Sequence, residues 1–142
     1  MHGVLFSSLV FAVALAGSST AVAAGQSVLS TGQQAVVEKA TAKLSADEKR
    51  MVAEWPDSKK LAEFFCAKAG LAAIKKKERA ADRVILGPDD EGVKKFVLTG
   101  NTQLSGRGSA RMHGGWKDFA FVCDLDPAKA TVKSFTYKLD VK

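Results

Sequence analysis

A glycine-rich hairpin sequence decides the fold: residues 104–123 read LSGRGSARMHGGWKDFAFVC. Apolar or small side chains recur at every second position from Leu104 to Met112, and again from Phe119 to Cys123. A Gly-Gly pair separates the two runs. Period-two alternation interrupted by glycine predicts two antiparallel strands joined by a tight turn.

Further short strands are predicted on both sides of this hairpin. Apolar or alternating runs favour strands at residues 83–86, 95–99 and 131–139. Gly87-Pro88 and Gly100-Asn101 end the first two, because glycine and proline supply turn geometry.

Helical spacing of apolar residues is found only before these strands. It predicts helices over residues 33–44, about 46–54 and about 58–77. Ser45 and Glu48 occupy the two positions of a capping box at the start of the second helix. Because helices come first and strands second, we expect an α+β domain with N-terminal helices packed on an antiparallel β-sheet of about four to five strands.

The first residues have the order of an export signal. Residues 1–24 carry no charged side chain, and an apolar run at 4–16 is followed by small residues and an A-x-A pattern. This order predicts a signal peptide cleaved near Ala23 or Ala24. The apolar run is shorter than the ~20 residues that span a bilayer, so no membrane span is expected in the mature protein. The predicted parts are a signal peptide (1–24), a flexible lead-in (25–32) and a single domain (33–142).

The two cysteines are expected to form a disulfide. An exported chain meets an oxidising compartment, periplasmic or extracellular, in which cysteines pair. Cys66 lies in the apolar stripe of the longest helix, and Cys123 on the inner face of the penultimate strand. Gly106 and Gly108, on the inner face of the preceding strand, would leave room for a helix to approach closely.

The chain is basic, with a formal net charge of +6 and a pI of about 9.4. Such a charge permits binding to an acidic glycan, anionic lipid or acidic protein. Export makes nucleic acid the least favoured partner, and none is expected. The one tight basic run, Lys75-Lys76-Lys77, is interpreted as a solvated helix end, with a binding patch as the alternative.

Several motifs resemble a known family. They are Phe65-Cys66-Ala67, Asp82-Arg83-Val84, the glycine-rich run 104–111, Trp116, Phe119, and the runs 121–123 and 132–137. Between Trp55 and Tyr137 the chain resembles small exported domains of Gram-negative bacteria, closest to domain-of-unknown-function family nine-thirty. The resemblance implies an exported, disulfide-bonded domain and carries over no catalytic residue.

No catalytic, cofactor or metal motif stands out. His113 is the only histidine after the predicted signal peptide, and a hydrolase would have to combine it with Ser105 or Ser109, which lie on a predicted strand and in no G-x-S-x-G elbow. The acidic runs 89–91 and 124–126 lack the ligand spacing of a calcium loop. We therefore expect no catalytic residue, no cofactor and no metal ion.

The surface most suited to a partner is built from Arg107, Arg111, His113, Trp116 and Lys117. Strand alternation places both arginines on the face opposite Leu104. An exposed tryptophan among arginines has the composition of a binding hot spot. In the alternative interpretation, Trp116 packs on a helix or the sheet edge, and the arginines only solubilise the domain.

The leading hypothesis is a non-enzymatic module of the cell envelope that binds another macromolecule, a protein or an acidic glycan. A second hypothesis is an inhibitor of a secreted or host hydrolase, and a third is a hydrolase that uses His113. Export, basic charge and the lack of a catalytic constellation favour the first.

Overall fold

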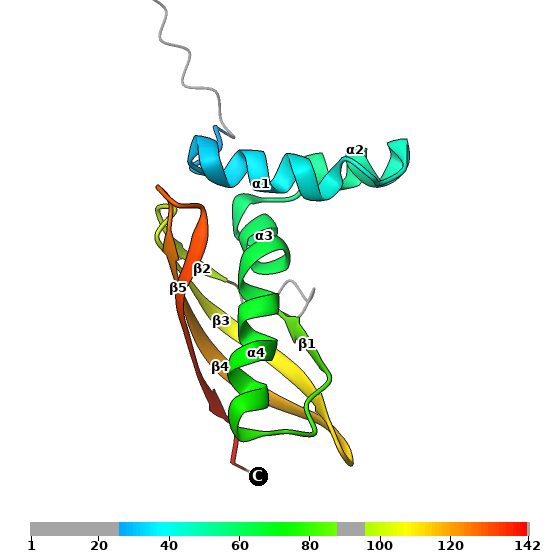
Figure 1. Cartoon of the computed structure of the whole chain (residues 1–142), viewed down its shortest axis with the longest axis vertical. Coiled ribbons are helices and arrows are strands. Elements are labelled where there is room, and N and C mark those ends of the chain that lie inside the picture. The colour runs from blue at the N-terminus through cyan, green and yellow to red at the C-terminus, as the bar shows by residue number, and fades with distance from the viewer. Residues whose placement is uncertain (1–25, 88–95, 142) are drawn as a thin grey trace, which may run out of the picture.

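The computed structural model describes residues 26–87 and 96–141. In these ranges a layer of helices precedes a five-stranded antiparallel sheet. One long helical column runs along one face of the sheet, and two shorter helices cross the top of that column (Figure 1). The α+β class predicted from the sequence is confirmed. The predicted signal peptide and the acidic run 89–91 lie outside the described residues.

The first two helices begin at capping boxes. Helix α1 spans Thr31–Thr41 and helix α2 spans Ala46–Glu54. Ser45 caps α2 together with Glu48, as the sequence predicted. Ser30 caps α1 in the same way with Gln33, so α1 begins two residues before the predicted start at Gln33.

The residues that precede α1 are attached to the domain. Leu29 is buried in the core, and the Val28 N–H donates to Asp57 over 2.7 Å. The Ser30 hydroxyl donates to the Pro127 carbonyl oxygen over 2.7 Å, in the turn between the last two strands. The segment described as a flexible lead-in thus contributes a core side chain and a helix cap.

The long helix contains a π-helical turn. Helix α3 (Asp57–Leu61), the π segment η1 (Ala62–Cys66) and helix α4 (Ala67–Lys77) follow one another without a break. The sequence predicted one α-helix over about 58–77, so the position of the helix is confirmed and its uniform geometry is corrected. A π turn widens the helix by one residue, which rotates the side chains that follow it.

The sheet has the strand order β1-β3-β4-β5, and β2 also pairs with β3. Its strands are β1 (Arg83–Leu86), β2 (Val97–Thr99), β3 (Gln103–Met112), β4 (Gly115–Asp126) and β5 (Thr131–Leu139). All described pairings are antiparallel. An irregularity between Asp124 and Leu125 shifts the register of the β4–β5 pair.

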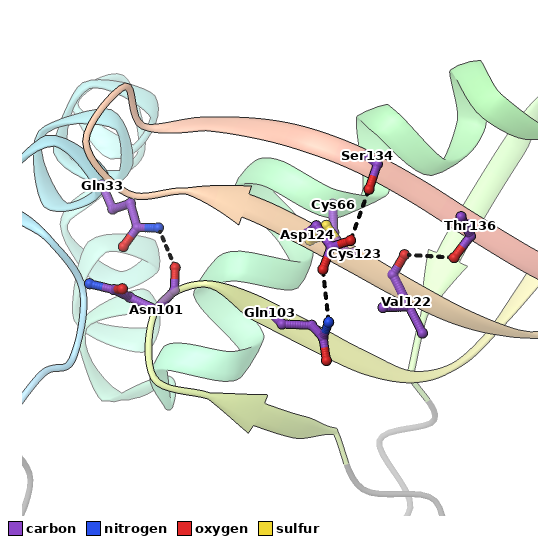
Figure 2. Close-up of a disulfide and its surroundings, with 9 residues drawn as sticks. All are labelled: Gln33, Cys66, Asn101, Gln103, Val122, Cys123, Asp124, Ser134 and Thr136. Carbon is purple, nitrogen blue, oxygen red and sulfur yellow. Dashed lines mark hydrogen bonds between the residues drawn. A yellow bond between two sulfur atoms is a disulfide. The ribbon is translucent and has the colours of Figure 1, made fainter.

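The core lies between the helical column and the inner face of the sheet. Phe119, Phe121 and Phe135 form edge-to-face and stacked pairs there, with ring centroids 5.3–6.4 Å apart. Within this layer Cys66 of η1 is bonded to Cys123 of β4 (Figure 2). Both cysteines are 0% exposed, and the predicted helix-to-strand disulfide is confirmed.

The strand glycines make room for aromatic rings rather than for the helix. A Cβ at Gly106 would lie 2.9 Å from the Phe96 ring, and one at Gly108 would lie 2.7 Å from the Phe119 ring. The expectation of a close helix approach at these glycines is therefore wrong. The close approach of helix to sheet occurs at Gly70 of α4, where a Cβ would lie 2.8 Å from the Phe135 ring.

Candidate functional site

The outer face of the sheet is the surface on which the predicted partner residues gather. The helical column packs on the inner face, and none of the described helices lies on the other side (Figure 1). Strand pairing orders the outer side chains into rows. At one end of the sheet Arg83 lies opposite Arg111, and Arg111 lies opposite Trp116.

A second row lies four residues away along β3. Arg107 is opposite Ala120 of β4, which is in turn opposite Lys138 of β5. The small Ala120 side chain leaves a hollow of about 410 Å³ between this row and Asp140. The two rows thus place cationic side chains beside a depression at the end of β5.

The Trp116 side chain is partly exposed to solvent, with 43% of its surface accessible. It lines a groove of about 490 Å³ together with the turn residue His113, Lys117 and Val141. Because a tryptophan is highly buried on average, this exposure leaves a large apolar surface available for contact. The alternative in which Trp116 packs on a helix is not what the structure shows.

Both arginines of the predicted surface are held by carboxylates. Arg111 donates from Nε and from a terminal nitrogen to the two oxygens of Asp82, at 2.8 and 3.0 Å. This hydrogen bond and the guanidinium charge hold the pKa of Asp82 below its ordinary value and raise that of Arg111. Arg107 pairs with Asp140, at the end of β5. The pairs reduce the positive charge of the surface and fix the direction of each guanidinium.

The structure thus brings all five predicted surface residues to one end of the sheet, although Lys117 lies opposite Ala110 and therefore on the inner face, with the parity of Phe119. His113, Trp116 and Lys117 share the groove, Arg111 is the strand neighbour of Trp116, and Arg107 lies beside the adjoining hollow. Sequence reasoning missed three participants: Asp82, Asp140 and Arg83. Of these three, only Arg83 has a signal in the sequence, namely its position in the alternation of the predicted strand 83–86.

A hydrolase site that combines His113 with Ser105 or Ser109 is not assembled among the described residues. The Ser109 hydroxyl donates to Asp118 over 2.5 Å, and no hydrogen bond joins His113 to a serine there. His113 itself is exposed in the β3–β4 turn. In the described residues His113 is therefore not joined to Ser109, whose hydroxyl is held by Asp118 instead.

The acidic residues of β4 take part in hydrogen bonds within the protein. Asp124 accepts hydrogen bonds from Gln103 at 2.8 Å and from Ser134 at 3.0 Å (Figure 2). Both bonds lower the pKa of Asp124, and the bond from Gln103 has the larger effect. Asp126 accepts from the Lys129 N–H at 3.0 Å. Within 26–87 and 96–141, no three histidine, cysteine or acidic residues form a group that could hold a metal ion.

The fold and the site together define a disulfide-closed α+β domain with one sheet face that none of the described helices covers. The chain belongs to the family described as Domain of Unknown Function (DUF930), whose model matches residues 56–142. That match includes the long helix and all five strands, whereas α1 and α2 precede it. The family suggested by the sequence motifs is thereby confirmed. Among curated proteins and solved structures, none matches the chain.

Across the part of the chain that the structure describes, no helix has both the length and the apolar character needed to cross a membrane.

Proposed function

We propose that this protein is exported and acts as a non-enzymatic binding module of the cell envelope. Its partner, a macromolecule of the envelope, binds the outer face around Trp116. The observation that carries the proposal is a half-exposed tryptophan opposite the carboxylate-held Arg111, with the carboxylate-held Arg107 four residues along β3, on a sheet face that no described helix covers.

Trp116 supplies the apolar part of the contact. Tryptophan and arginine are enriched among residues that dominate binding energies, and they act best near the centre of a contact. Trp116 lies between the Arg111 position on one side and the groove with Val141 on the other. A partner that covers the groove would remove this ring from water.

The arginine pairs supply pre-organisation. Ordering a long side chain on binding costs about 0.5–1.5 kcal/mol, and a guanidinium already held in place avoids most of that cost. Asp82 and Asp140 hold Arg111 and Arg107 in this way before any partner arrives. Export is supported by the signal-peptide pattern of residues 1–24 and by the family resemblance.

The test is a pull-down from envelope extract at low and at high salt, with a double variant Trp116→Ala, Arg111→Ala. A matched control is Met51→Ala, Arg50→Ala, which removes one exposed apolar side chain and one ion-paired arginine on α2. We expect one component to be retained at high salt by the wild-type protein and by the control, and lost with the Trp116 variant. Equal retention by both variants would contradict the proposal.

A further inference from the structure

We propose that one end of the molecule docks on the anionic surface of a lipid membrane. This end is formed by the C-terminal turn of α4, the β3–β4 turn and the end of β5. The inference goes beyond the proposed function, because it adds an anionic lipid surface as a second ligand that this end of the molecule, with the exposed Trp116, would meet. We call this end the basic pole. Six basic residues there are exposed and form no ion pair with another described residue: Lys75, Lys76, Lys77, Arg79, Arg83 and Lys117.

The positive charge of the chain is unevenly distributed. Residues 26–74 contain seven basic and six acidic side chains, so the chain from its first described residue to the middle of α4 is nearly neutral. Most of the net charge of +6 therefore belongs to the later part of the chain. The basic run 75–77 alone contributes three of these charges, and all three side chains are exposed.

Several elements bring these charges to one end. Figure 1 shows the last turn of α4, the loop after it, the β3–β4 turn and the C-terminal end of β5 together at the bottom of the molecule. The charge of Lys75 acts on Asp82, just before β1, and that of Glu78 acts on Tyr137 of β5. Helix α4 contacts both β1 and β5, the two strands at the ends of the strand order.

The six basic residues form no ion pair with another described residue. Asp82 and Asp140, which could neutralise them, are already bound to Arg111 and Arg107. Arg83 in addition lies directly opposite Arg111 in the strand register, and like charges at such positions repel. An anionic ligand would relieve that repulsion.

The basic pole also carries apolar side chains. Trp116 is 43% exposed, Val141 is 91% exposed, and both line the groove at the β3–β4 turn. Tryptophan is favoured at the boundary between lipid head groups and acyl chains, where its ring is partly apolar and its N–H stays hydrated. A cluster of four to eight lysines and arginines beside such side chains is typical of proteins that bind anionic lipid.

A membrane fits this arrangement because the charges come from separate elements and share only one end of the molecule. A plane of anionic head groups contacts them all without matching a particular shape. Each basic side chain near such a surface strengthens binding by about 1 kcal/mol, so loss of three should weaken it roughly 100-fold.

The experiment measures binding to vesicles of phosphatidylcholine alone or mixed with phosphatidylglycerol. The protein is expressed from Met1 and purified in the form that the cell produces. The pole variant Lys75→Gln, Lys76→Gln, Lys77→Gln is compared with Lys39→Gln, Lys43→Gln, Lys49→Gln, which removes the same charge from exposed positions in the α1–α2 region. A Trp55→Phe background leaves Trp116 as the only tryptophan, so its emission reports on insertion.

We expect the wild-type protein and the α1–α2 control to bind only the mixed vesicles, with a blue shift of Trp116 emission, and the pole variant to bind roughly 100-fold more weakly. Equal weakening by both triple variants, or no binding to mixed vesicles, would overturn the inference. Capture of a protein through Trp116 without vesicle binding would overturn it and leave the proposed function standing. If the protein neither binds the mixed vesicles nor captures a partner through Trp116, both the inference and the proposed function are contradicted.

Discussion

Removal of the disulfide should cost this domain a large share of its stability. The perturbation is the double variant Cys66→Ala, Cys123→Ala, which leaves small apolar side chains where both cysteines are fully buried. The bond joins residues 57 positions apart, and a loop of that length corresponds to about 4 kcal/mol of denatured-state entropy. A small domain has a free energy of unfolding of about 5–15 kcal/mol, so the loss is substantial.

Urea denaturation followed by circular dichroism measures this loss. With a urea slope of about 1–3 kcal/mol/M, the unfolding midpoint should fall by roughly 1.5–4 M. The wild-type protein unfolded and refolded under reducing conditions is the control, because it keeps both sulfur atoms and lacks only the bond. A double variant within about 1 kcal/mol of the oxidised protein would refute the reasoning that the cross-link limits the unfolded chain.

Four further outcomes are expected. Gly108→Ala should destabilise the domain by about 1–3 kcal/mol in thermal unfolding, because its Cβ would lie 2.8 Å from the Ile85 carbonyl oxygen, a backbone atom that cannot move aside; an unchanged melting temperature would contradict this. Ser45→Ala should lower the free energy of unfolding by about 1 kcal/mol through loss of the α2 cap, measured by urea denaturation. The lowered pKa of Asp124 should stabilise the folded state above the ordinary carboxyl pKa of about 4, and this stabilisation should be lost as pH falls through the lowered value. Asp124→Asn should therefore flatten the pH dependence of the urea midpoint in that range. Mass spectrometry of the exported protein should find the N-terminus next to the Ala23–Ala24 pair, and an intact Met1 would contradict export.

Much of the fold could be predicted because its signals are local. Alternation along residues 104–112 fixes which side chains of β3 face the core, and the observed burial follows that alternation. The two cysteines lay in predicted apolar surfaces of a helix and a strand, so their pairing followed from the expected packing. The serine that opens a capping box is likewise visible in sequence, although Ser30 was overlooked beside Ser45.

Other features depend on contacts between distant segments. The π turn at Ala62–Cys66 has no periodicity of its own in five residues, so a uniform α-helix was the natural prediction. The Arg107–Asp140 pair joins positions 33 residues apart, and only the register of β3, β4 and β5 brings them together. The space at Gly108 is likewise explained by the ring of Phe119, whose position follows from packing rather than from sequence pattern.

The candidate surface was predicted in composition but not in charge. Alternation correctly assigned Arg111 and Trp116 to the outer face, where they are strand neighbours. No pattern in the sequence indicates that Asp82 neutralises part of this charge, because the bidentate pair forms between side chains 29 residues apart.

The central claim is that a partner binds the outer face at Trp116, and a photo-crosslinking side chain placed there in living cells tests it most directly. The same side chain at Met51, which is 52% exposed on α2, serves as the control. We expect irradiation to yield a discrete adduct, with a protein, a glycan or a lipid, from position 116 and none from position 51. No adduct at position 116, or the same adducts at both positions, would contradict the claim.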